Sequence, residues 1–217
     1  MPVITIASSK GGVGKTVCAQ LLAASLAPAV ATIDADPNRT LYDWSTEVYE
    51  GEPFLCRAES DAGRLVHLIH ELADTVPLLI VDTAGFGNQA ATAAMAAADA
   101  ILVPTTTSRA DVVETRRTVQ LAEGLAKAAR RLVPVRILGN RIKRALVARH
   151  ALSELDEAGL PRLSTTLSDV VGYVELTHTG KLPTASPAAT EIKALLAELR
   201  ELGWICLLYT SDAADEL

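Results

Sequence analysis

Residues 8–16 read SSKGGVGKT, and this stretch decides the fold because of what stands on either side of it. The apolar, β-branched run VITIA at residues 3–7 precedes the glycines, and a helix-compatible segment at residues 17–27 follows them. A strand, a glycine-rich turn and a helix in this order allow backbone N–H groups to surround a phosphate. The stretch therefore predicts a phosphate-binding loop directly after the first strand.

The residue types in this loop suit a nucleotide. Side chains in place of the glycines would keep the oxygens of a polyphosphate away from the backbone. We expect Lys15 to contact the β- and γ-phosphates and the Thr16 hydroxyl to ligate Mg²⁺. The alternative is a glycine-rich turn without a ligand. The predicted nucleotide-binding residues of the loop are Gly11, Gly12, Val13, Gly14, Lys15, Thr16 and Val17.

The loop departs from the common G-x-x-x-x-G-K-[ST] pattern, because Ser9 stands in place of the first glycine and Lys10 precedes the others. The form K-G-G-x-G-K-[ST] resembles the deviant Walker A loop of the ParA/MinD ATPase family. This resemblance implies that Lys10 reaches across a homodimer to the nucleotide of the partner subunit. It also implies that Lys10 and Lys15 take part in catalysis. The alternative for Lys10 is a side chain that is only solvated.

Two acidic residues follow the second apolar run, in the sequence IDADPN at residues 33–38. Because strand ends of a parallel sheet meet at one edge, we expect both carboxylates beside the phosphate loop. The segment resembles the Walker A′ motif of ParA proteins, which implies that Asp36 positions or deprotonates the attacking water. By the same resemblance Asp34 helps to organise Mg²⁺ and Thr16. The alternative is that one of the two caps the next helix, for which Asp34 is an equal candidate.

A third apolar run, PLLIVDTAG at residues 77–85, ends in a single aspartate and has the form of a Walker B element. We expect Asp82 to contact the metal, because phosphoryl-transfer sites hold Mg²⁺ through the loop hydroxyl and a strand-end Asp. Residues 85–87 read GFG, a backbone able to move as a γ-phosphate sensor must. Asn140 follows a later strand and is expected to contact adenine, as in related P-loop ATPases, or to form a turn.

The apolar runs are continuous rather than alternating, and longer helix-like segments separate them. This pattern predicts an α/β fold with a doubly wound, mostly parallel sheet that has helices on both faces. The expected strands are residues 3–7, 30–33, 78–81, 100–103 and 133–138. Trp44 is expected to be structural. Residues 191–201 read as a packing helix rather than a basic membrane-binding one.

Composition agrees with one globular domain at residues 1–204, since 49% of the 217 residues are hydrophobic and only 4% are aromatic. No apolar run is long enough to span a membrane, and no room is left for a cleavable signal peptide, so we expect a cytoplasmic protein. The scattered Cys18, Cys56 and Cys206 match neither a disulfide framework nor a metal site. His67 and His70 are expected on the surface rather than at a metal.

The formal charge of −6 argues against a uniformly basic nucleic-acid binder, but the charges are segregated. Residues 124–153 contain eight basic residues and neither Asp nor Glu. Such a segment can form an electropositive patch on an acidic body, or simply a solvated helix face. The predicted DNA-binding residues are Arg130, Arg131, Arg141, Lys143, Arg144 and Arg149.

The resemblance covers roughly residues 2–202 and is closest to short ParA ATPases of plasmid partition. It implies ATP and Mg²⁺ as cofactors, a homodimer in the ATP state, and non-specific DNA binding on the nucleoid without a membrane. It also implies a ParB-like centromere-binding partner that stimulates ATP hydrolysis. A MinD-like positioning ATPase and a metabolic P-loop enzyme, such as one similar to dethiobiotin synthetase, remain alternatives. A role like that of nitrogenase reductase lacks the paired cluster cysteines beyond Asp82.

Residues 205–217 do not continue the pattern of the chain. They follow a natural stop at Gly203 and Trp204, and they resemble translated vector sequence more than a designed element. We expect this tail to be non-native or disordered and leave it out of the functional argument.

Overall fold

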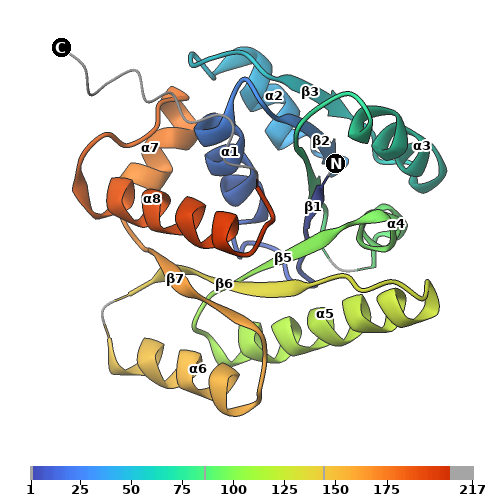
Figure 1. Cartoon of the computed structure of the whole chain (residues 1–217). Helices are drawn as coiled ribbons and strands as arrows, with labels where there is room; N and C mark the ends of the chain where they lie inside the picture. Colours follow the sequence, from blue (N-terminus) through green and yellow to red (C-terminus); the bar gives the residue numbers. More distant parts are fainter. Residues whose placement is uncertain (1, 86, 144, 206–217) are drawn as a thin grey trace.

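The computed structural model describes residues 2–85, 87–143 and 145–205, which form one seven-stranded sheet covered by helices (Figure 1). The strands are β1 (Val3–Ile6), β2 (Ala31–Ala35), β3 (Leu55–Ala58), β4 (Leu79–Thr83), β5 (Ala100–Thr105), β6 (Val135–Ile142) and β7 (Arg162–Ser168). The helices are α1 (Lys15–Leu26), α2 (Thr40–Glu47), α3 (Ala62–Ala73), α4 (Gln89–Ala97), α5 (Arg109–Ala128), α6 (Leu146–Glu157), α7 (Val171–Thr179) and α8 (Ser186–Glu201).

All paired strands are parallel, in the order β3-β2-β4-β1-β5-β6-β7. The strand β1 lies between β4 and β5 and is buried along its whole length. Strands buried on both faces read as continuous apolar runs, which is why the sequence pattern predicted them. The doubly wound parallel sheet is therefore confirmed.

The helices form two layers, one on each face of the sheet (Figure 1). On one face, Ile4 and Ile6 of β1 pack in a single cluster with residues of α1, α2, α7 and α8. On the opposite face, Ile33 and Val81 pack with α3 and α4, and Ile101 packs with α5 and α6. Because every helix is fixed against the sheet, the loops at the strand ends have rigid supports.

The expected strands differ from the observed ones at the two edges of the sheet. The edge strands β3 and β7 were not predicted, because Arg57 interrupts the short β3 and β7 is mostly polar, so neither forms a continuous apolar run. The strand β6 also continues to Ile142, beyond the predicted end at residue 138. Asn140 consequently lies within a strand rather than after it.

Trp44 is a core residue, as expected: 3% of it is exposed, and its Nε1 donates to the Leu176 carbonyl of α7 at 3.0 Å.

Helix α8 packs on the sheet through the fully buried Leu195 and Leu199, which confirms that it is a packing helix. Among the described helices, none has both the length and the apolar character needed to cross a membrane. Ile205 is buried in the core, so it does not belong to the tail that we expected at residues 205–217. The rest of that tail, residues 206–217, lies outside the described residues.

Candidate nucleotide site

A cavity of about 620 Å³ lies where β1, β2, β4 and β6 end. The phosphate loop and the first turn of α1 form its floor, and residues that follow β2 and β4 border it. Residues of β6, the segment after β7 and helix α7 complete it. Cavities of this size hold small molecules, and the carboxyl edge of a parallel sheet is where such ligands bind.

The phosphate loop depends on Gly14. Its φ of +93° lies in the left-handed region, and a Cβ at this position would come within 2.1 Å of Asn140 Nδ2. Helix α1 begins at the next residue without a side-chain cap, so its first N–H groups remain available to a ligand. An uncapped helix start behind a glycine turn is the arrangement that binds phosphate.

Lys15 lies at the base of the loop with 8% of its surface exposed, and its Nζ donates to the Lys10 carbonyl at 3.4 Å. Burial lowers the pKa of the Lys15 amine, and the negative charges of Asp82 and Asp36 oppose this shift. The expected phosphate-binding lysine thus faces two carboxylates, as the sequence predicted for these three residues.

The Thr16 hydroxyl donates to Asp82 Oδ2 at 2.7 Å. Asp82 is fully buried, and its Oδ1 has no hydrogen-bond partner within residues 2–85, 87–143 and 145–205. Burial raises the pKa of Asp82 to about 7. A buried carboxylate oxygen without a partner, beside a hydroxyl, fits a magnesium ion held directly or through water. Thr16 and Asp82 would hold that ion, which would neutralise phosphate charge in phosphoryl transfer.

The carboxylate of Asp34 contacts backbone N–H groups in the structure. Its Oδ2 accepts the backbone N–H groups of Leu41 at 2.7 Å and Tyr42 at 3.0 Å, and its Oδ1 accepts that of Asp36 at 3.0 Å. The Thr16 contact expected of Asp34 is made by Asp82 instead. Because Oδ2 accepts the first N–H groups of α2, these contacts fit the capping alternative for Asp34, and its metal role stays a prediction.

Asp36 lies at the wall of the cavity and is half-buried. Its Oδ1 accepts the Asn38 N–H at 2.9 Å, which fixes the carboxylate at the end of β2. The charge of Asp36 acts on both Lys15 and Asp82, so the three functional groups belong to one site. Its role toward the attacking water stays a prediction.

Asn140 holds the phosphate loop in place. Its Nδ2 donates to the Val13 carbonyl at 2.8 Å, and its Oδ1 accepts the Arg141 N–H at 3.0 Å. The predicted turn is wrong, because the residue is a buried member of β6. Asn140 also lines the cavity, and its contact with adenine stays a prediction.

Sequence reasoning missed the far wall of the cavity. This wall consists of Ser168, Asp169, Val170, Tyr173, Val174 and Thr177. Glu191 of α8 supports it, since its carboxylate accepts the Ser168 N–H at 2.8 Å and the Tyr173 hydroxyl at 2.7 Å. The polar pair Ser168-Asp169 at a strand end was the available signal, and it was overlooked together with β7.

The basic segment does not form the single patch that its composition suggested. Arg130 and Arg131 follow α5 near the start of β6, whereas Arg141 and Lys143 lie at its other end, roughly 20 Å away for a strand of this length. Arg131 is also paired with Asp99 at 2.7 Å. Arg149 lies on α6, and Arg144 lies outside the described residues. The two groups therefore do not make one patch, and the DNA-binding role of each stays a prediction.

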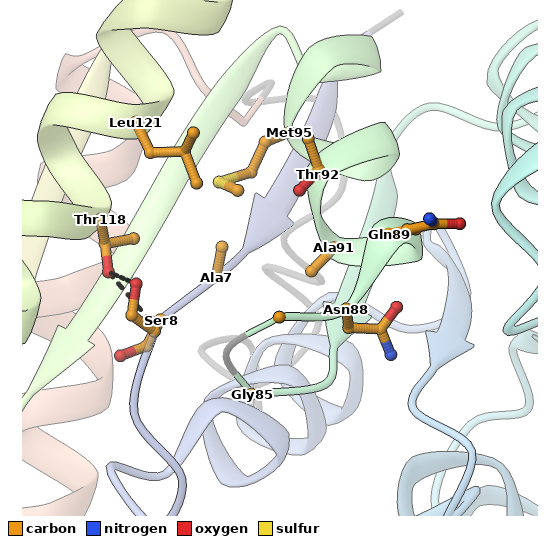
Figure 2. A pocket seen from close by; sticks show the side chains of 12 residues that line it. Ala7, Ser8, Gly85, Asn88, Gln89, Ala91, Thr92, Met95, Thr118 and Leu121 are labelled. Carbon is orange, nitrogen blue, oxygen red and sulfur yellow. Dashed lines mark hydrogen bonds between the residues drawn. The ribbon is translucent and has the colours of Figure 1, made fainter.

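A second pocket, of about 360 Å³, lies between α4, α5 and the end of β1 (Figure 2). Ala7, Met95 and Leu121 give it a mostly apolar lining. Gly87 of the expected γ-phosphate sensor borders it with a φ of +80°, whereas Phe86 lies outside the described residues.

His67 and His70 are both exposed, and no group of three His, Cys, Asp or Glu side chains suited to a metal occurs in the described part of the chain.

Comparison with known proteins shows the family of this chain. The family model described as VirC1 protein matches residues 1–203. Protein ParA of Rhizobium radiobacter is 31% identical over 124 residues, a match that spans 56% of each chain. Protein virC1 of the same organism is 26% identical over 192 residues, which cover 84% of this chain and 83% of that protein.

Solved structures share the fold. Apo McdA of Cyanothece superposes with a TM-score of 0.77 at 19% identity, over 92% of this chain and 99% of the McdA chain. The septum site-determining protein MinD of Pyrococcus horikoshii, complexed with Mg-ADP, gives a TM-score of 0.73 at 20% identity. That match covers 93% of this chain and 97% of MinD. At these identities the likeness concerns the fold alone.

Proposed function

This chain belongs to the VirC1 family within the ParA/MinD ATPases, and from that premise we propose that it is an ATP-driven DNA partition ATPase. In the proposed cycle, ATP and Mg²⁺ bind at the cavity and two subunits join as a homodimer. The dimer binds DNA without sequence preference. A ParB-like centromere-binding protein then stimulates hydrolysis, and the DNA is released.

One observation carries the nucleotide part of this proposal. Lys15, Thr16 and Asp36 line a single cavity and Asp82 is hydrogen-bonded to Thr16, although these residues come from three separate segments of sequence. A lysine and an uncapped helix start attract phosphate, while a hydroxyl and a buried carboxylate suit Mg²⁺. Asp36 at the wall would orient the attacking water, and Lys10 would contact the nucleotide of the partner subunit.

The basic residues at the end of β6 and on α6 support contact with DNA. Arg141, Lys143 and Arg149 are all exposed, and the first two lie 3.7 Å from the carboxylate of Asp169. Dimerisation would bring two such groups to one assembly, and several phosphate contacts together make binding strong and salt-dependent. We therefore propose that the protein acts on the nucleoid in the cytoplasm, without a membrane.

The test is co-sedimentation with DNA in the presence of ATP, ADP or no nucleotide. We expect retention with ATP only, a steep loss as salt rises, and no retention of Lys10→Ala. Lys143→Ala and Arg149→Ala should weaken retention. Arg130→Ala is the matched control at the other end of β6 and should leave it unchanged.

Equal retention in all three nucleotide states would overturn the proposed switch. ATP hydrolysis without any DNA retention would instead favour a positioning ATPase that acts on another surface, or a small-molecule enzyme of this fold. Absence of ATP binding in the wild type would overturn the nucleotide site itself.

A further inference from the structure

One carboxylate of helix α8 ties together the two ends of the far wall of the nucleotide cavity. Helix α8 lies beside α7 and β7 (Figure 1). The Oε2 of its Glu191 accepts the Ser168 N–H at 2.8 Å and the Tyr173 hydroxyl at 2.7 Å, and its Oε1 accepts the Ser168 hydroxyl. Both oxygens are therefore engaged, and they join the last residue of β7 to helix α7.

The turn between these contacts lies at the edge of the sheet, since β7 is an edge strand. Asp169 and Val171 are both exposed, and helix α7 begins after Val170 without a side-chain cap among the described residues. Exposed segments with few buried contacts open more easily than the core of a protein. The carboxylate that holds both ends of this turn is therefore well placed to control its order.

The Tyr173 hydroxyl remains a donor to Glu191. Burial raises the pKa of this hydroxyl, and the hydrogen bond and the negative charge of Glu191 add to the shift. The phenol consequently keeps its proton over the ordinary pH range. Because the backbone of Tyr173 belongs to α7 and its hydroxyl is held by α8, the position of the ring is fixed at both ends.

The wall differs in chemistry from the floor of the cavity. Lys15 and Thr16 of the floor suit phosphate and a metal ion, whereas Val170, Tyr173 and Val174 give the wall aliphatic and aromatic groups. Such groups suit a base and a sugar, because bases stack on aromatic rings and pockets for small molecules are mostly apolar. The cavity thus has one part for phosphate and another for a nucleoside.

We propose that Glu191 is a positioning residue that orders this wall before the nucleotide arrives, so that it strengthens binding of the nucleoside but not of the phosphates. A wall that is ordered in advance loses less conformational entropy when the ligand binds. This proposal rests on the proposed function, because it assumes a nucleoside triphosphate at the cavity. The ordering of the wall by Glu191 can also be measured without any ligand.

Glu198 offers a matched control on the same helix. It lies two turns after Glu191, and its carboxylate accepts the N–H groups of Ser164 at 2.7 Å and Thr165 at 2.9 Å and the Ser164 hydroxyl at 2.8 Å. These two residues of the described strand β7 stand apart from the cavity lining. Removal of either carboxylate should therefore weaken the attachment of α8 to β7, but only Glu191 should affect the wall.

The test compares two ligands by calorimetry in the presence of Mg²⁺. A non-hydrolysable ATP analogue carries the nucleoside, whereas inorganic tripolyphosphate carries the phosphate charges alone. Glu191→Ala should weaken binding of the analogue by about tenfold, the usual effect of having to order one or two residues on binding. Its affinity for tripolyphosphate should stay within about twofold of the wild type, and Glu198→Ala should bind both ligands as the wild type does.

Two further measurements test how Glu191 acts. In the nucleotide-free protein, Glu191→Ala should speed amide hydrogen exchange at residues 168–173 and leave residues 8–16 unchanged. Tyr173→Phe keeps the ring and removes one contact, so it stays informative if Glu191→Ala is too unstable to purify. It should weaken the analogue but not tripolyphosphate, and should have no further effect in the Glu191→Ala background.

Equal weakening of both ligands in Glu191→Ala, or unchanged binding of the analogue, would overturn the proposal. An equal loss in Glu198→Ala, or unchanged hydrogen exchange of the wall, would do the same. Wild-type protein that binds tripolyphosphate as tightly as the analogue would overturn this proposal alone and leave the phosphate site intact. Wild-type protein that binds neither ligand would overturn the proposed function, and this proposal with it.

Discussion

The hydroxyl of Thr16 donates to the carboxylate of Asp82 at 2.7 Å, and this hydrogen bond joins the phosphate loop to the end of β4. The two residues are 66 positions apart in the chain. The contact leaves Asp82 Oδ1 buried without a partner in the described residues, and it is the point at which the candidate metal site can be tested.

Asp82→Asn should stabilise the metal-free, nucleotide-free protein near neutral pH. Burial raises the pKa of Asp82 from 3.8 to about 7, so the folded protein binds more protons than the unfolded chain between these values. Stability of the wild type therefore falls as pH rises through this window. Asparagine removes that dependence and can still accept from Thr16. In urea unfolding, the free energy of unfolding of the variant should exceed that of the wild type. This difference should grow to roughly 4 kcal/mol by pH 7 and then remain constant. A difference in the free energy of unfolding that does not change with pH would contradict the raised pKa of Asp82.

Asp36→Ala should retain ATP and lose hydrolysis by about 10²- to 10⁴-fold, the usual contribution of a group that orients or deprotonates water. Binding of a fluorescent ATP analogue and release of phosphate separate the two effects. Asp43→Ala, an exposed change on the neighbouring helix α2, should leave both unaltered. Hydrolysis at the wild-type rate in Asp36→Ala would exclude this residue from the chemistry.

Gly14→Ala should destabilise the protein by about 2 kcal/mol or more and abolish nucleotide binding. The left-handed backbone is unfavourable for alanine, and its Cβ would collide with the side-chain amide of Asn140. Gly11→Ala is the control within the same loop, because a Cβ there meets nothing within 4 Å. Chemical denaturation should show a large loss for the first variant and little change for the second.

Asp34→Ala should reduce the free energy of unfolding by about 1–2 kcal/mol, because the first N–H groups of α2 lose their acceptor. The magnesium dependence of nucleotide binding should stay the same, in contrast to Asp82→Ala. Denaturation and a Mg²⁺ titration of analogue binding measure the two properties. Loss of the Mg²⁺ response with unchanged stability would favour the metal role instead.

The central strands and the phosphate site could be predicted from sequence because they depend on local patterns. A buried parallel strand needs a continuous apolar run, and a loop around phosphate needs glycines, a lysine and a hydroxyl in close succession. The edge strands of this sheet lack a continuous apolar run. In β7, the order RLSTTLS alternates apolar and polar residues imperfectly, and the far wall of the cavity was missed with it.

Roles that depend on distant partners were harder to predict. Asp34 could equally have faced a metal or a helix, and only the position of α2 shows its contacts with the helix. The basic segment looked continuous because sequence carries no information on the extent of β6, which separates Arg130 from Arg141. The contact of Lys10 with Asp111 joins residues about a hundred positions apart, and no local pattern indicates it.

The late position of the far wall has a consequence for synthesis on the ribosome. The phosphate loop is synthesised well before Tyr173 and its support Glu191, because both follow it by more than 150 residues. A nascent chain can therefore present the loop long before it can enclose a nucleoside. Nucleotide capture would then follow synthesis of α7 and α8, and ATP would stabilise the folded domain rather than guide its early folding.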